Sequence, residues 1–220
     1  KIMETVRKGK ALKDPAKWEE YKNLMKEHNV PDWYIKSCEK IKYMFPKAHA
    51  AAYVTNAFRI AWFKVHKPEA YYAAFFSIRA ADDFDSEIMC FEKEKVKNKM
   101  KEIDLLGNNA TPKDKTMYPV LELVLEMYER GINFLPIDLY KSHSTKFLVE
   151  EGGIRPPLNS IPGLGTVAAQ GIEKARQEGK FMSIDDMKIR SKVGDSVAEL
   201  LKKFGCLDGM SQSNQISLFR

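Results

Sequence analysis

The sequence predicts a mainly α-helical protein with a small β element in its second half. Two observations predict this fold class. Helix start and stop signals, chiefly Asp or Ser at caps, Pro at first helical positions and Gly at ends, divide most of the chain into segments of helix length. Residues 137–155 instead contain short runs of β-branched and aromatic residues around a Gly-Gly turn, which is typical of short strands.

Helices are expected throughout the first half of the chain. Asp14 offers an N-cap and Pro15 the first helical position. Pro31, Pro46 and Pro68 each mark an interruption, because proline disfavours helical backbone at the residue before it. The expected helices cover 15–28, 32–43, 47–65, 69–79 and 86–103, and the aromatic segment 69–79 should be buried.

The second half contains a candidate boundary and then shorter elements. Gly107-Asn108-Asn109 is typical of a long turn, and Gly131 is placed to end a helix. The expected helices cover 115–130, 166–176, 183–190 and 195–204. The expected strands cover 137–140, 146–149 and 154–155, with a turn at 151–153.

The bulk composition excludes several classes of protein. Hydrophobic residues make up 44% of the chain, but no apolar run reaches the roughly 18 residues of a membrane span, so no membrane partner is expected. The three cysteines and four histidines are scattered, which fits a reducing cytoplasm and predicts neither a disulfide framework nor a metal site. Because the chain starts at Lys1 without an initiator Met, we expect it to be part of a longer protein.

Positive charge is concentrated in two zones. Residues 1–67 hold 15 Lys and Arg against 7 Asp and Glu, and residues 152–205 hold 9 against 6. This distribution favours two separate contacts with a polyanion, although a solvated surface would have the same composition.

One segment, residues 158–167, has the pattern of a helix-hairpin-helix that binds duplex DNA. Gly163 and Gly165 stand one residue apart and allow positive φ and close backbone approach. A helix is expected to begin directly after Gly165, so that its free N–H groups form an anion site suited to a phosphate. Such binding is independent of base sequence. The alternative is a Pro-Gly turn that only packs helices.

Side chains of the hairpin are expected to divide between packing and binding. Ile161, Leu164 and Val167 should hold the two helices together. The predicted DNA-binding residues are Ser160, Ile161, Gly163, Leu164, Gly165, Thr166 and Lys174.

Two nearby features are expected to be structural. A second hairpin at 192–196 lacks the second glycine and places Asp195 where a phosphate would sit. Asp185 lies about as far beyond the hairpin as the catalytic Asp of helix-hairpin-helix DNA glycosylases. However, Ser183 before an acidic first turn is better explained as a helix cap.

Long blocks of sequence resemble a known family. They are 7–10, 30–35, 42–54, 79–85, 159–165, 205–208 and 215–219. In this order they resemble the C-terminal end of the PolC-type bacterial replicative DNA polymerase III alpha subunit. The resemblance implies three parts: a late fingers segment over 1–107, a duplex-binding domain over 108–208, and a clamp-binding tail over 209–220.

The resemblance also implies partners for particular residues. The fingers segment would face the incoming deoxynucleoside triphosphate through Lys47 and His49, with Tyr43 and Phe45 on the adjoining wall. Lys47 and His49 suit this role because they fall in the first turn of an expected helix. In the tail, 215–219 resembles the pentapeptide that binds the sliding clamp, with Gln215, Leu218 and Phe219 as the contacts.

No catalytic residue is expected in this chain. Asp82, Asp83 and Asp85 resemble a two-metal set, but a loop that caps the helix near Ser86 explains them better. The family holds its catalytic aspartates, and the Mg²⁺ they would bind, in a palm outside this segment, so no cofactor is expected here. The expected function is part of template-directed DNA synthesis. The alternatives are a non-catalytic adaptor between DNA and a clamp, or a DNA glycosylase.

Overall fold

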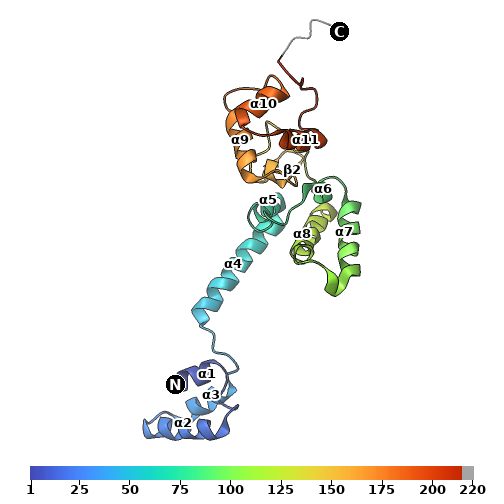
Figure 1. The fold of residues 1–220 in the computed structure, drawn as a ribbon. Helices are drawn as coiled ribbons and strands as arrows, with labels where there is room; N and C mark the ends of the chain where they lie inside the picture. The colour runs from blue at the N-terminus through green and yellow to red at the C-terminus, as the bar shows by residue number, and fades with distance from the viewer. Residues whose placement is uncertain (215–220) are drawn as a thin grey trace. The chain divides into compact units, whose positions relative to one another are not determined.

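The computed structural model describes residues 1–214, which form two compact units, Lys1–Ala61 and Trp62 onward. Helices dominate both units, and the only strands among the described residues form one small sheet (Figure 1). The predicted mainly α fold with a small β element is therefore confirmed. No helix of the described residues combines the length and the apolarity needed to cross a membrane.

The first unit is built on three short helices, α1 (Ile2–Arg7), α2 (Pro15–Glu27) and α3 (Asp32–Lys40). The carboxylate of Asp14 accepts the amide of Lys17, which confirms the predicted cap of α2. A small core joins the helices, formed by Val6, Ala11, Trp18, Tyr21, Met25, Ile35 and Cys38. Helix α4 (Lys47–His66) begins in this unit, as predicted, and has no buried residue.

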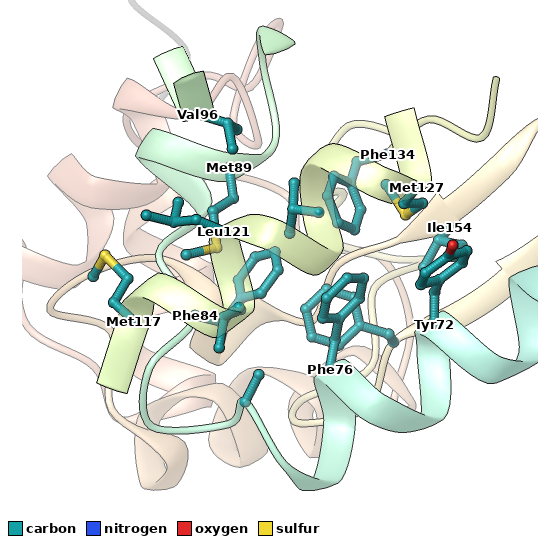
Figure 2. Close-up of a cluster of buried hydrophobic side chains, with 14 of the residues drawn as sticks. Tyr72, Phe76, Phe84, Met89, Val96, Met117, Leu121, Met127, Phe134 and Ile154 are labelled. Carbon is teal, nitrogen blue, oxygen red and sulfur yellow. The ribbon is translucent and has the colours of Figure 1, made fainter. Parts of the chain in front are cut away.

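The second unit opens with a helical part built around one aromatic core. Its helices are α5 (Pro68–Ile78), α6 (Ser86–Met89), α7 (Lys93–Leu106) and α8 (Pro112–Glu129). Tyr72 and Phe76 of α5 point into a cluster that includes Leu121 and Met127 of α8 (Figure 2). Helices α7 and α8 lie side by side (Figure 1).

The predicted helix 86–103 is wrong, because two helices, α6 and α7, occupy this range. The hydroxyl of Tyr128 donates to the carbonyl of Met89, 2.7 Å away, and so satisfies a carbonyl at the end of α6. Phe91 then leaves the helical path and its ring meets that of Phe204 at 5.6 Å. Long-range packing therefore breaks a segment whose local signals favour one helix.

The predicted β element is partly correct. β1 (Leu148–Glu150) and β2 (Gly153–Arg155) pair antiparallel across the predicted turn, with Val149 opposite Ile154. The predicted strand 137–140 is wrong. There the carboxylate of Asp138 accepts the amides of Tyr140 and Lys141 at 2.7 and 2.9 Å, and this forms a turn instead of an extended strand.

The last part of the second unit contains α9 (Thr166–Arg176), α10 (Ile184–Ser191) and α11 (Asp195–Lys203). These helices surround a second core that includes Ile161, Leu164, Ile172, Met187 and Leu201. All three lie within two residues of their predicted bounds, and Gly205, at φ +73°, follows the C-cap of α11.

The structure does not separate at the predicted boundary near residue 107. The short turn Gly107–Asn109 joins α7 to α8, and residues on both sides of it share the aromatic core. In sequence, the first compact unit ends and the second begins within α4. The division into fingers, duplex-binding domain and tail remains a prediction about function.

Candidate nucleic-acid interface

The predicted hairpin is present within residues 158–167, with positive φ at Gly163 but not at Gly165, where φ is −69°. A single turn of 3-10 helix (Leu158–Ser160) leads into it, and α9 begins at Thr166. Gly163 has φ +88°, and the amide of Leu164 closes the turn on the carbonyl of Ile161 at 3.0 Å. Only glycine adopts this φ without strain, which explains the residue at position 163.

The packing of the hairpin agrees with the sequence for two residues and disagrees for two others. Ile161 and Leu164 are almost fully buried in the second core, as predicted. Val167 is 84% exposed, so its predicted packing role is wrong. Ser160 is buried and its hydroxyl donates to the carbonyl of Pro157 at 2.6 Å, so its side chain is used inside the hairpin.

The start of α9 is open to a ligand. Gly165 is its N-cap and supplies no side-chain hydrogen bond, so the first-turn amides lack the partner that a Ser or Asp cap would give. A Cβ built on Gly165 would have no heavy atom within 4 Å. Thr166 and Lys174 are both exposed and lie eight residues apart on one face of α9, about 12 Å along the axis.

A cavity of about 1040 Å³ adjoins the hairpin. Residues 159–166 form one wall, and α5, the loop 81–85 and residues 145–149 form the others. Lys113 and Lys146 also line it, and the sequence did not single out either lysine. Their position beside the hairpin depends on tertiary packing, so no local motif could have identified them.

The acidic loop 81–85, which also lines this cavity, is engaged in structural contacts. The carboxylate of Asp85 accepts the amides of Glu87 and Ile88 at 2.9 and 3.3 Å, so the predicted cap of α6 is confirmed. Asp83 accepts the hydroxyl of Thr116 at 2.6 Å. Within residues 1–214 no group of three or more His, Cys, Asp or Glu side chains is arranged to hold a metal ion.

The second hairpin, between α10 and α11, has a similar path and a different charge. Lys192 takes the left-handed conformation, with φ 55° and ψ 41°, and Gly194 caps α11. Asp195 in the first turn of α11 pairs with Lys188 at 2.6 Å. The hydrogen bond to Asp195, and to a smaller extent the one to Asp185, raises the pKa of Lys188. A carboxylate therefore already stands where an anion would approach.

The glycosylase-like position, Asp185, belongs to a helix start. The hydroxyl of Ser183 accepts the amide of Asp186 at 3.1 Å, which confirms the predicted cap of α10. The carboxylate of Asp185 contacts Lys188 and accepts the side-chain amide of Gln212 at 3.2 Å.

The predicted nucleotide site lies in the first unit as an exposed aromatic row. Ring centroids are 6.4 Å apart for Tyr43 and Phe45 and 4.9 Å apart for Phe45 and His49. Lys47 and His49 stand in the first turn of α4, as expected, and both are exposed. Nucleotide contact by these four residues stays a prediction. The predicted clamp contacts, Gln215, Leu218 and Phe219, lie outside the described residues.

The second unit matches a known class of DNA-binding motif. A family model described as a helix-hairpin-helix motif matches residues 131–216, which include both hairpins. The second unit thus carries a helix-hairpin-helix motif, as the sequence predicted.

The particular relatives are polymerases. The chain is 55% identical over 218 residues to the DNA polymerase III PolC-type of Clostridium perfringens, 55% to that of Caldanaerobacter subterraneus and 53% to that of Bacillus subtilis. These matches cover 99–100% of this chain and 15% of each relative. The chain is thus homologous to a segment of PolC-type DNA polymerase III, which confirms the resemblance found in the sequence.

Proposed function

We propose that the second unit binds duplex DNA without regard to base sequence, through the hairpin 161–165 and the start of α9. The observation that carries this proposal is the uncapped, open N-terminus of α9 beside Gly163, in a region that matches the helix-hairpin-helix family. The helix dipole and the free amides favour a phosphate oxygen. Main-chain amides contact the DNA backbone and do not read bases.

The contact surface consists of backbone and a few exposed side chains. Gly163 and Gly165 allow the DNA backbone to approach, and Thr166 and Lys174 add a hydroxyl and a cation along α9. Ile161 and Leu164 hold the turn rigid from the core, and their amides already donate to carbonyls within the hairpin. The amide and the hydroxyl of Ser160 likewise both donate to the carbonyl of Pro157.

We propose further that the chain works as part of a replicative DNA-directed DNA polymerase. Similarity over its whole length to a segment of three such polymerases supports this. In that role the chain positions substrates and carries no catalytic step. We expect the carboxylates that would hold Mg²⁺ to belong to the remainder of the polymerase.

The first unit would contact the incoming deoxynucleoside triphosphate. Lys47 and His49, at the start of α4, suit the phosphates, and the rings of Tyr43 and Phe45 suit the base or sugar. In the whole polymerase, replacement of Lys47 by Ala should raise the KM for nucleotide more than it lowers kcat. An unchanged KM would contradict this assignment.

The tail would tether the polymerase to a sliding clamp through Gln215, Leu218 and Phe219. The resemblance of 215–219 to a clamp-binding pentapeptide supports this, because apolar side chains on an extended peptide fit a pocket on the clamp. Pull-down of the clamp should be lost when Leu218 and Phe219 are both changed to Ala, with duplex binding retained. Retained pull-down would contradict the assignment.

The hairpin is tested by a substitution that blocks the anion site without strain. Gly165→Val adds a side chain where no neighbouring atom lies within 4 Å, and φ at this position, −69°, suits any residue. We expect duplex affinity at low salt to fall by about tenfold or more, which is typical for the loss of charge-assisted phosphate contacts. Fluorescence anisotropy with a short duplex measures this.

The matched control is Gly194→Val in the second hairpin. Gly194 is also an N-cap with open space around its Cβ position and ordinary φ. This variant should bind duplex nearly as well as the unaltered chain. Equal duplex affinity of Gly165→Val and the unaltered chain would contradict the proposed role of the hairpin.

A further inference from the structure

The hairpin rests on a neighbouring segment, residues 143–146. The amide of Leu158 donates to the carbonyl of His143 at 2.9 Å, and the amide of Asn159 donates to the carbonyl of Ser144 at 3.1 Å. These two bonds fix the residues that lead into the hairpin. The position of the hairpin therefore depends on the conformation of His143 and Ser144.

The ring of His143 holds this segment in its turn. Its Nδ1 accepts the amide of Thr145 at 2.9 Å and the amide of Lys146 at 3.2 Å. Asp and Asn side chains commonly accept from the amides two and three residues ahead in the same way. His143 thus closes a turn with an atom that can also be protonated.

His143 also lies beside α9, the helix that follows the hairpin. Nε2 of His143 is 3.7 Å from Oε1 of Glu173 on α9. Oε2 of Glu173 accepts the amide of Ser144 at 3.2 Å. Burial raises the pKa of Glu173, but the hydrogen bonds from Ser144 and the positive charge of Arg176 oppose it, and the pKa is lowered overall. The segment therefore contacts both the entry to the hairpin and the helix that follows it.

We propose that His143 is a positioning residue for the DNA-binding hairpin, and that a second proton on its ring weakens duplex binding. This inference rests on the proposed DNA-binding function. It concerns a residue that does not itself touch DNA.

The direction of the effect follows from donor and acceptor chemistry. Backbone amides can only donate, so Nδ1 must carry a free lone pair to accept from Thr145 and Lys146. An imidazolium has a hydrogen on both nitrogens, so its Nδ1–H would face those two amides. Glu173 would attract the charged ring, whereas Arg176 on α9 and Lys146 in the segment itself would repel it. The turn, and with it the support of the hairpin, would be lost.

This direction is opposite to the ordinary one. An added positive charge near a DNA site usually strengthens binding, because it neutralises phosphate and releases counterions. If His143 acted only as a surface charge, affinity would rise as its ring gained a proton. A fall in affinity is therefore a signature of the positioning role.

The experiment compares three forms of the full chain by duplex anisotropy at about pH 8 and about pH 5.5, a span in which histidines commonly change charge. His143→Ala should bind about tenfold more weakly at the higher pH, because two amides lose their acceptor. His143→Asn should bind like the unaltered chain there, since its amide oxygen can accept from both amides. Between the two pH values the unaltered chain should lose several-fold more affinity than His143→Asn.

His28→Ala is the matched control, because His28 is an exposed histidine at the end of α2 in the first unit. It should change neither affinity nor its pH dependence. Absence of duplex binding by the unaltered chain at the higher pH would overturn the proposed function itself. If the unaltered chain binds, full affinity of His143→Ala, or the same pH course in His143→Asn, would overturn the role of His143. Thermal melting of each variant confirms that the chain is folded.

Discussion

The two hairpins of the second unit share a glycine N-cap two residues after a residue with positive φ, but they differ in electrostatics. Each ends in a glycine N-cap without a side-chain hydrogen bond, Gly165 before α9 and Gly194 before α11. The first turn of α9 holds no acidic residue, whereas α11 begins with Asp195, which pairs with Lys188. A carboxylate stabilises the start of its own helix but repels an approaching phosphate.

The two turns also differ in the residue that has positive φ. This residue is Gly163 in the first hairpin and Lys192 in the second. A non-glycine residue there costs about 1–2 kcal/mol. The second hairpin packs closely against α9 at this point. A Cβ on Gly171 of α9 would lie 2.6 Å from the carbonyl oxygen of Ser191, the residue before Lys192. These differences are consistent with the proposal that the first hairpin binds DNA and that the second packs the domain.

The largest effect is expected from Gly163→Ala. At φ +88° an added Cβ is strained, and it would lie 3.2 Å from Cδ1 of Leu200. The free energy of unfolding should fall by about 1–2 kcal/mol, measured by urea denaturation. The reciprocal change, Lys192→Gly, should raise it by about 0.5 kcal/mol, because relief of strain exceeds the entropy that glycine loses. If both changes destabilise equally, the two turns are not equivalent in backbone.

A smaller effect is expected from Asp195→Asn. Removal of the carboxylate makes the start of α11 resemble that of α9, so duplex affinity should rise by about two- to threefold. Glu199→Gln is the matched control, since it removes the same charge one turn later on α11, at an exposed position. Anisotropy titrations of both variants measure the difference. An equal gain from both would show that only net charge matters.

The smallest effect is expected from Lys174→Gln on α9. Loss of one phosphate contact should weaken duplex binding by less than about twofold at moderate salt and lower the slope of log affinity against log salt by about one. Lys101→Gln removes an equally exposed lysine on α7 and should leave the slope unchanged. Identical slopes for the two variants would contradict a phosphate contact by Lys174.

Local features of this protein could be predicted well from the sequence. The bounds of α9, the glycine of the first hairpin and the caps at Asp14, Asp85 and Ser183 all agree with the structure. Each depends on interactions between residues within four positions of one another. Such short-range hydrogen bonds and φ preferences are encoded by residue type alone.

Other features required the tertiary structure. The break between α6 and α7, the burial of Ser160, the exposure of Val167 and the shared core around residue 107 all depend on distant neighbours. The turn at Asp138 replaced a predicted strand, because a side chain competed with strand pairing for the same amides.

The sequence by itself therefore determined most of the helices, the hairpin motif and the resemblance to a polymerase segment. Tertiary structure alone decided which residues stand around the hairpin. Lys113 and Lys146 beside its cavity, and His143 beneath its entry, are brought there by packing between segments far apart in the chain. Contacts of this kind depend on the burial of two cores that no single segment forms alone.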